Sequence, residues 1–109
     1  MFARHLTLQL KRGVIREFPN VIEKEFLPLL RKQKGFLEEF VLIAPNQIET
    51  VAISLWEQKE YAEKFNREVY PEMVKLLDKY VEGTPVVKDF EVQFATLPVF
   101  EKFAKAVTV

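Results

Sequence analysis

The chain has 109 residues, 49% of them apolar, which is enough for one domain with a single core. Its 16 basic and 16 acidic residues cancel and form no dense basic patch, so nucleic acid is not an expected partner. The absence of cysteine excludes disulfides and thiol catalysis, and a single histidine excludes a multi-histidine metal site within one chain.

The apolar runs are too short to cross a membrane. One of the longest, Phe40 to Ala44, is far below the roughly 20 residues that a bilayer requires. The first residues alternate between polar and apolar side chains and lack the continuous apolar core of a signal peptide. We therefore expect a cytoplasmic protein without membrane contact.

The first third of the chain predicts a strand followed by a helix. Residues 2–10 alternate with period two, which indicates a strand. From 14 to 30 apolar residues recur at intervals of three and four, the pattern of an amphipathic helix. Two prolines lie inside that span, so we expect Pro19 in the first helical turn or at a break, and a bend near Pro28.

The remaining segments predict a hairpin, a second helix and a fourth strand. Two strand-like stretches, 36–44 and 48–55, flank a short turn, which predicts an antiparallel hairpin. A helical pattern begins at Glu57 and is interrupted at Pro71. Strand-like alternation returns over 86–95.

This order of elements predicts the fold class. Strand, helix, strand, strand, helix, strand is the βαββαβ order of α+β ferredoxin-like folds, in which helices cover one face of a four-stranded antiparallel sheet. We expect one domain spanning 1–109, with 96–109 as a C-terminal arm or short helix. The first and third strands are predicted to be central, adjacent and parallel.

The alternation also predicts which side chains face the helices. Three apolar rows are assigned to that side: Leu6, Leu8 and Leu10; Val51, Ile53 and Leu55; and Phe90, Val92 and Phe94. The opposite face then carries a mixture of polar, small and apolar residues: Ala3, His5, Thr7, Gln9, Thr50, Ala52, Ser54, Glu91, Gln93, Ala95, Leu37, Val41 and Ile43. Such a face suits a homodimer with the sheets facing each other, and the alternative is a solvated face on a monomer.

Two stretches resemble a known family. The segments "LPLLRKQKGF" (27–36) and "SLWEQKEYAEKF" (54–65), with the hairpin between them, are similar to the antibiotic biosynthesis monooxygenase domain of the dimeric α+β barrel superfamily. The similarity covers roughly residues 2 to 95. It implies a homodimeric barrel and a family that includes cofactor-free oxygenases, quinol oxygenases and haem-degrading enzymes.

The resemblance does not extend to the haem-degrading members. Those enzymes use an asparagine on the first strand and a histidine in the second helix. The matching positions here are Arg4 and a site near Asn66, so an axial haem ligand is missing. We expect no cofactor.

The resemblance to cofactor-free oxygenases implies a small phenolic or quinol-like substrate that reduces oxygen itself. Four aromatic residues are candidates for the walls of its site: Phe40, Trp56, Tyr61 and Phe65. Arg4 or His5 is a candidate for stabilising a substrate oxyanion, and His5 is also the one imidazole available as a proton shuttle. The expected catalytic residues are therefore His5, Arg4 and Trp56.

Each of these residues also has a purely structural interpretation. Trp56 suits the core at a strand-to-helix corner, His5 a hydrogen-bonded position in a dimer interior, and Arg4 an edge position or an ion pair. The competing functional hypothesis is a non-catalytic homodimeric module that binds a small hydrophobic ligand.

Overall fold

The computed structural model describes residues 1–96 and 98. Its elements are β1 (Phe2–Leu10), the 3-10 helix η1 (Val14–Arg16), α1 (Phe18–Val21), the π-helical turn η2 (Ile22–Phe26), α2 (Leu27–Arg31), β2 (Phe36–Ile43), β3 (Glu49–Trp56), α3 (Lys59–Glu68), α4 (Tyr70–Leu77) and β4 (Val81–Glu91). The arm predicted for 96–109 lies outside the described residues, apart from 96 and 98.

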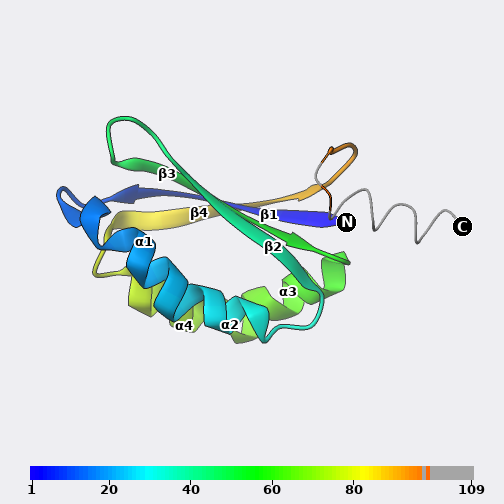
Figure 1. Ribbon diagram of the computed structural model, residues 1–109. Helices are drawn as coiled ribbons and strands as arrows, with labels where there is room; N and C mark the ends of the chain where they lie inside the picture. The colour runs from blue at the N-terminus through cyan, green and yellow to red at the C-terminus, as the bar shows by residue number, and fades with distance from the viewer. Residues whose placement is uncertain (97, 99–109) are drawn as a thin grey trace, which may run out of the picture.

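The predicted α+β ferredoxin-like fold is confirmed. The four strands form one sheet in the order β2-β3-β1-β4, and the helices cover one face of it (Figure 1). We call the face toward the helices the inner face and the other the outer face. β1 and β3 are central and adjacent, as expected, but they are antiparallel and the predicted parallel pairing is wrong. The helical crossover returns β2 parallel to β1, and the hairpin then reverses β3 between them.

The first helical arm is assembled from short pieces because two prolines interrupt it. Pro19 lies in the first turn of α1 and Pro28 in the first turn of α2, where their missing amide donors cost least. Between them the chain forms the π-helical turn η2. The second arm is divided in the same way, since Pro71 opens α4 directly after α3.

The inner face of β3 differs from the prediction. Leu8 pairs with Thr50, and Arg4 pairs with Ser54. Directly opposed residues of an antiparallel pair share a face, so Thr50, Ala52, Ser54 and Trp56 face the helices and Val51, Ile53 and Leu55 do not. The alternation of β3 is predicted correctly but its inner face is not, because the row that carries the buried Thr50 and Ser54 faces the helices.

The neighbouring strands follow the same register. Val41 and Ile43 pair with Ala52 and Thr50, so they lie on the inner face and not on the outer face as predicted. Phe90 pairs with Ala3 and therefore lies on the outer face. β4 ends at Glu91, so Val92 and Phe94 follow the strand and do not extend its inner row.

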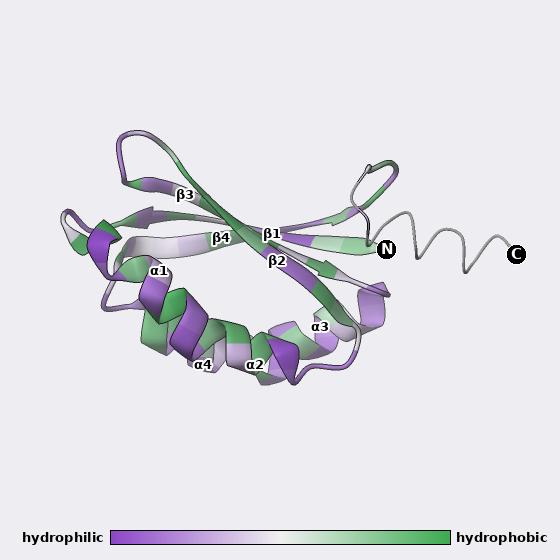
Figure 2. Cartoon of the chain, viewed as in Figure 1, coloured by the Kyte–Doolittle hydropathy of each residue, from purple (hydrophilic) through white to green (hydrophobic). Residues whose placement is uncertain are grey.

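These corrections make the outer face more apolar than predicted. Leu42 is 55% exposed and Phe90 is 50% exposed, and Phe40 and Val86 are exposed beside them on the two edge strands. Figure 2 shows hydrophobic segments along β2 and β3. In the described part of the chain the helices all lie on the other side, so they do not cover this surface.

Gly35 fixes the start of β2 against α3. Its φ is +82°, and a Cβ added there would overlap Cβ, Cγ and Cδ2 of Tyr61. The carbonyl of Gly35 also accepts a hydrogen bond from the backbone N–H of Glu57 at 2.8 Å, which joins it to the end of β3. Only glycine permits both this conformation and this close approach.

We expect Gly35→Ala to lower the free energy of unfolding by about 3 kcal/mol or more, from left-handed strain and overpacking together. Gly13→Ala is the matched control, because Gly13 has φ +81° but nothing within 4 Å of its added Cβ. That variant should lose only about 1 kcal/mol. Urea denaturation of both measures the difference, and equal losses would contradict the role assigned to Tyr61.

Candidate functional site

An apolar cavity lies between the inner face of the sheet and the helices. Its volume is about 50 Å³. The lining is mostly aliphatic and aromatic: Leu6, Leu8, Phe18, Ile22, Phe26, Leu30, Val41, Ala52, Phe65, Met73 and Leu77. Five side chains with polar atoms complete it: Arg4, Glu39, Thr50, Ser54 and Tyr70. We call this space the inner cavity.

Arg4 is the cation of the inner cavity. It is only 5% exposed, because its row on β1 faces the helices. Its Nη2 donates a hydrogen bond of 2.9 Å to Oδ1 of Asn66 on α3. The guanidinium carbon lies 4.0 Å from the ring centre of Tyr70 and 5.2 Å from that of Phe65, both within the range of cation–π attraction. The buried Nε has no hydrogen-bond partner among the described residues.

Burial disfavours the charged form of Arg4. Desolvation lowers the pKa of the guanidinium, while the nearby Tyr70, Asp89 and Glu39 oppose that shift. The guanidinium nevertheless stays protonated, as arginine does in proteins generally. The cavity therefore carries a fixed positive charge on one wall.

Glu39 supplies an ionisable acid on the opposite side. It is half-buried on the inner face of β2. Burial raises the pKa of its carboxyl to about 8, although the positive charge of Arg4 acts in the other direction. Near neutral pH Glu39 is therefore mostly uncharged, and it exchanges its proton close to physiological pH.

The strand register brings these groups into one polar row. Arg4 pairs with Ser54 on one side and with Asp89 on the other, and Ser54 pairs in turn with Glu39. The row therefore runs Asp89, Arg4, Ser54, Glu39 across all four strands. Adjacent strands are about 4.8 Å apart, which places the backbones at Arg4 and Glu39 roughly 10 Å from each other. No ion pair joins Arg4 to Glu39.

Trp56 lies behind the cavity wall and not in it. Its side chain is 0% exposed and its indole Nε1 donates a hydrogen bond of 2.9 Å to Oγ of Ser54. Its ring centre lies 5.2 Å from that of Phe65, which does line the cavity. Trp56 thus supports two cavity residues from behind. Ser54 keeps its own O–H free to donate.

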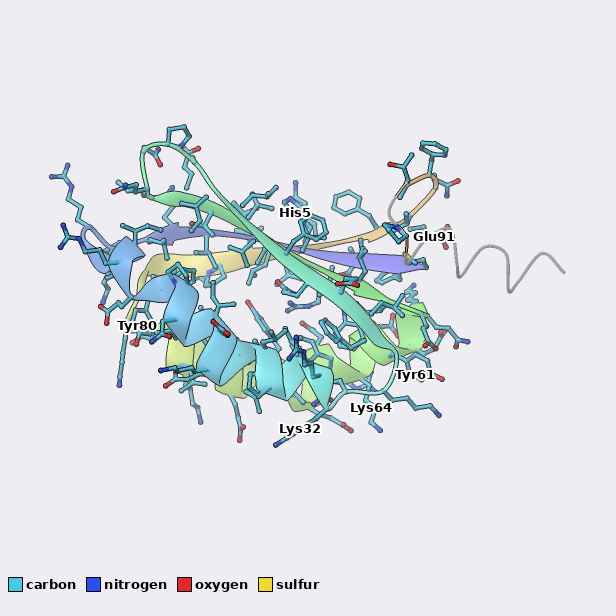
Figure 3. All side chains as sticks on the ribbon, viewed as in Figure 1. His5, Lys32, Tyr61, Lys64, Tyr80 and Glu91 are labelled. Atoms are coloured by element: carbon cyan, nitrogen blue, oxygen red, sulfur yellow. The ribbon has the colours of Figure 1, made fainter. Side chains whose placement is uncertain are left out.

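The other candidate residues are dispersed. Tyr61 packs against Gly35 from the first turn of α3, and the ammonium of Lys34 lies 5.5 Å from its ring centre. Phe40 lies on the outer face of β2. His5 lies on the outer face of β1, pointing away from the helices (Figure 3). Its ring is at 85° to that of Phe90, with 5.9 Å between the ring centres. Of the six sequence candidates, the structure brings Arg4 and Phe65 together in the inner cavity.

Three residues around Arg4 are missed in the sequence analysis. No role is given there to Glu39 or Tyr70, and Asn66 is named only as the position that lacks a haem-ligating histidine. The sequence does indicate that Glu39 shares a face of β2 with Val41 and Ile43. Recognising Glu39 as a cavity residue also requires knowing that this face lies toward the helices.

A shallow hollow adjoins the inner cavity at the edge of β2. Its volume is about 250 Å³ and its lining residues come from α1, η2, α2 and β2: Pro19, Ile22, Glu23, Leu27, Glu39, Phe40 and Val41. Three of these, Ile22, Glu39 and Val41, line the inner cavity as well. The two spaces therefore share part of their walls.

Among residues 1–96 and 98, no three His, Asp or Glu side chains are grouped as a metal site would require. No helix in that part of the chain is both long and apolar enough to span a membrane.

Comparison with solved structures identifies the fold. A monooxygenase of Streptomyces coelicolor, from the gene ActVA-Orf6 and in complex with nanaomycin D, superposes with a TM-score of 0.73 at 17% identity, over 89% of this chain and 91% of that one. SnoaB, a cofactor-independent oxygenase of Streptomyces nogalater, crystallised as a mutant, gives 0.71 at 18% identity over 89% and 96%. A proposed antibiotic biosynthesis monooxygenase of Deinococcus radiodurans gives 0.69 at 14% identity over 89% and 97%.

The chain has the fold of the antibiotic biosynthesis monooxygenases. The resemblance inferred from residues 27–36 and 54–65 is thereby confirmed at the level of the fold. No protein-family model and no curated protein matches the sequence. At these low identities the comparison says nothing of the reaction, which has to be argued from the site.

The pKa of Glu39 predicts how stability depends on pH. The carboxyl is protonated below about 8 in the folded chain but only below 4.5 when exposed. The folded state therefore binds the extra proton between those values, and stability falls as pH rises through this window before it levels off. We expect a loss of roughly 2–5 kcal/mol that is absent in Glu39→Gln.

Urea denaturation at several pH values across this window measures the effect. Glu38→Gln is the matched control, because Glu38 is the exposed neighbour of Glu39 on the same strand. It should retain the wild-type pH profile. A wild-type profile in Glu39→Gln would show that Glu39 ionises normally.

Proposed function

We propose that the protein is a cofactor-independent monooxygenase acting on a small phenolic or quinol-like molecule bound at the inner cavity. The observation that carries the proposal is the pair of ionisable groups, Arg4 and Glu39, on either side of Ser54 in otherwise apolar walls. The neighbouring folds named as oxygenases support it as an analogy.

The two groups suit the first step of such a reaction. Glu39, in its carboxylate form, accepts the proton of the substrate hydroxyl, which is efficient because its pKa of about 8 lies near neutrality. Arg4 stabilises the resulting oxyanion, whose pKa it lowers. The apolar walls exclude water and so strengthen this attraction.

The remaining steps use the substrate's own electrons. The anion reacts with O₂ at a ring carbon, a C–O bond forms, and protonation gives a hydroperoxide. Loss of water from it leaves a carbonyl group. The substrate loses two hydrogen atoms and gains one oxygen atom, and the second oxygen atom leaves as water, so no external reductant is needed.

The size of the site sets a condition on this proposal. An apolar cavity of about 150 Å³ admits benzene. The inner cavity, at about 50 Å³, is smaller, so an aromatic ring must also occupy the adjoining hollow of about 250 Å³. Displacement of the Ile22 and Val41 side chains would join the two spaces, with Glu39 at their boundary.

The second hypothesis is a non-catalytic module that binds a small hydrophobic ligand. Two observations favour it: the inner cavity is small, and His5 lies outside it. Both hypotheses use the same cavity. They differ in whether oxygen is consumed.

Oxygen uptake with a panel of anthrones, quinols and catechols, in the presence of a chelator, tests the oxygenase proposal. We expect turnover that rises with pH toward about 8, and that falls by about 100-fold or more in Glu39→Gln, since a general base contributes that much. Arg4→Met should also lower it, while Glu38→Gln and Arg12→Met, at exposed positions, should not. If none of the compounds is turned over, the oxygenase proposal fails and the non-catalytic binding module remains.

We further propose that the outer face pairs with a second copy of the chain. Exposed apolar side chains lie on both edge strands, and the buried Nδ1 of His5 has no partner among the described residues. Burying a large apolar side chain contributes about 1.5–3 kcal/mol, so a few such residues can hold a dimer. The helices already cover the inner face, which leaves the outer face for self-association.

Light scattering should therefore give about twice the 12.8 kDa mass of the chain. Leu42→Lys, at the 55% exposed position on the outer face, should produce a monomer. Leu76→Lys is the control, because Leu76 is 36% exposed on α4, on the other side of the molecule. A monomeric wild-type protein would contradict the proposal.

A further inference from the structure

Among residues 1–96 and 98, the charges around the inner cavity do not balance. Arg4 is 5% exposed and has a neutral hydrogen-bond partner, Asn66. The rings of Tyr70 and Phe65 attract the guanidinium but carry no negative charge. A buried cation without an anion is costly, and buried charges in proteins are normally paired.

The nearby acids do not supply the missing charge. Glu39 forms no ion pair with Arg4, and burial raises the pKa of its carboxyl to about 8, so it is mostly neutral near pH 7. Asp89, the cross-strand neighbour of Arg4, is exposed to solvent and forms no ion pair with it. Glu23 lines the shallow hollow at the edge of β2 and not the inner cavity.

We propose that the inner cavity is a binding site for a small monoanion, a single carboxylate or phenolate group on an apolar body, held by Arg4 while Glu39 keeps its proton. This deepens the proposed function by stating the charge of the ligand, and it rests on the same cavity. The anion supplies the counter-charge that Arg4 lacks, and its apolar body contacts the aliphatic and aromatic walls. The protonated Glu39 donates a hydrogen bond to it and does not repel it.

The free donors of Arg4 fit this ligand. Nε has no hydrogen-bond partner in the described part of the chain, and Nη2 donates to Asn66. A carboxylate accepts two parallel N–H bonds from a guanidinium, which makes this the stronger geometry. The O–H of Ser54 lies between Arg4 and Glu39 in the polar row and is free to donate a further bond.

The first arm of the test uses the wild-type protein. Titration followed by NMR would compare acetate, butyrate and benzoate with the neutral isosteres acetamide, butyramide and benzamide. We expect the carboxylates to bind at least about tenfold more tightly, because only they pair with Arg4. Equal affinity for an acid and its amide would overturn the proposal, even if oxygen uptake were observed.

The second arm uses pH. Since the anion binds the form with Glu39 protonated, benzoate affinity should fall about tenfold between pH 7 and pH 9, as that form declines from about nine-tenths to about one-tenth. Glu39→Gln should remove this dependence and keep the affinity measured at pH 7. An unchanged affinity at pH 9 in the wild type would contradict the part assigned to Glu39.

The third arm uses substitutions and separates the two proposals. Arg4→Met should lower benzoate affinity at least about tenfold, Arg4→Lys less, and the exposed Arg12→Met not at all. Wild-type affinity in Arg4→Met would overturn the anion site. 4-Nitrophenolate distinguishes the two anions: if carboxylates bind and the phenolate does not, the anion site stands and the phenol oxygenase proposal fails.

Discussion

The burial of Arg4 constrains the rest of the site. A guanidinium on the inner face of a central strand has to be accommodated by every layer around it: Asn66 from α3 accepts one hydrogen bond, and Phe65 and Tyr70 cover it with their rings. The same position in an ordinary core would hold another leucine, in line with Leu6 and Leu8. An aliphatic residue there would avoid the cost of desolvating a charge, and this cost is the reason for proposing an anionic ligand beside Arg4.

The polar row follows from the register of the sheet. Trp56 pairs with Phe2 at one end of β3, which places Ser54 beside Arg4 and Thr50 beside Leu8. The indole N–H then satisfies Ser54, so a buried serine is tolerated in the core. The one tryptophan of the chain therefore acts from behind the cavity, by fixing the register and supporting Phe65. Its predicted catalytic role stays a prediction.

The fold could be predicted from the sequence because it depends on periodicity. Alternation in 2–10 and 36–43, helical spacing after Val14, and the order of the segments were sufficient. The face of β3 could not be predicted, since Val51, Ile53 and Leu55 have the composition of a core row yet lie on the outer face. Alternation gives two rows, and only pairing across strands decides which row is inside. The composition of the site depends on which row of each strand lies inside. Arg4, which lies in the apolar row of the first strand, is therefore included in the sequence analysis, but Glu39 is not.

The construction of the first helical arm has a consequence for access. Two prolines and a π-helical turn divide the segment from Phe18 to Arg31, so no uninterrupted ladder of backbone hydrogen bonds runs along it. The central strands β1 and β3, by contrast, pair without a register shift from Phe2 to Gln9. We therefore expect local opening of the first helical arm to leave the sheet intact. A ligand could then enter while Arg4, Ser54 and Glu39 stay in register.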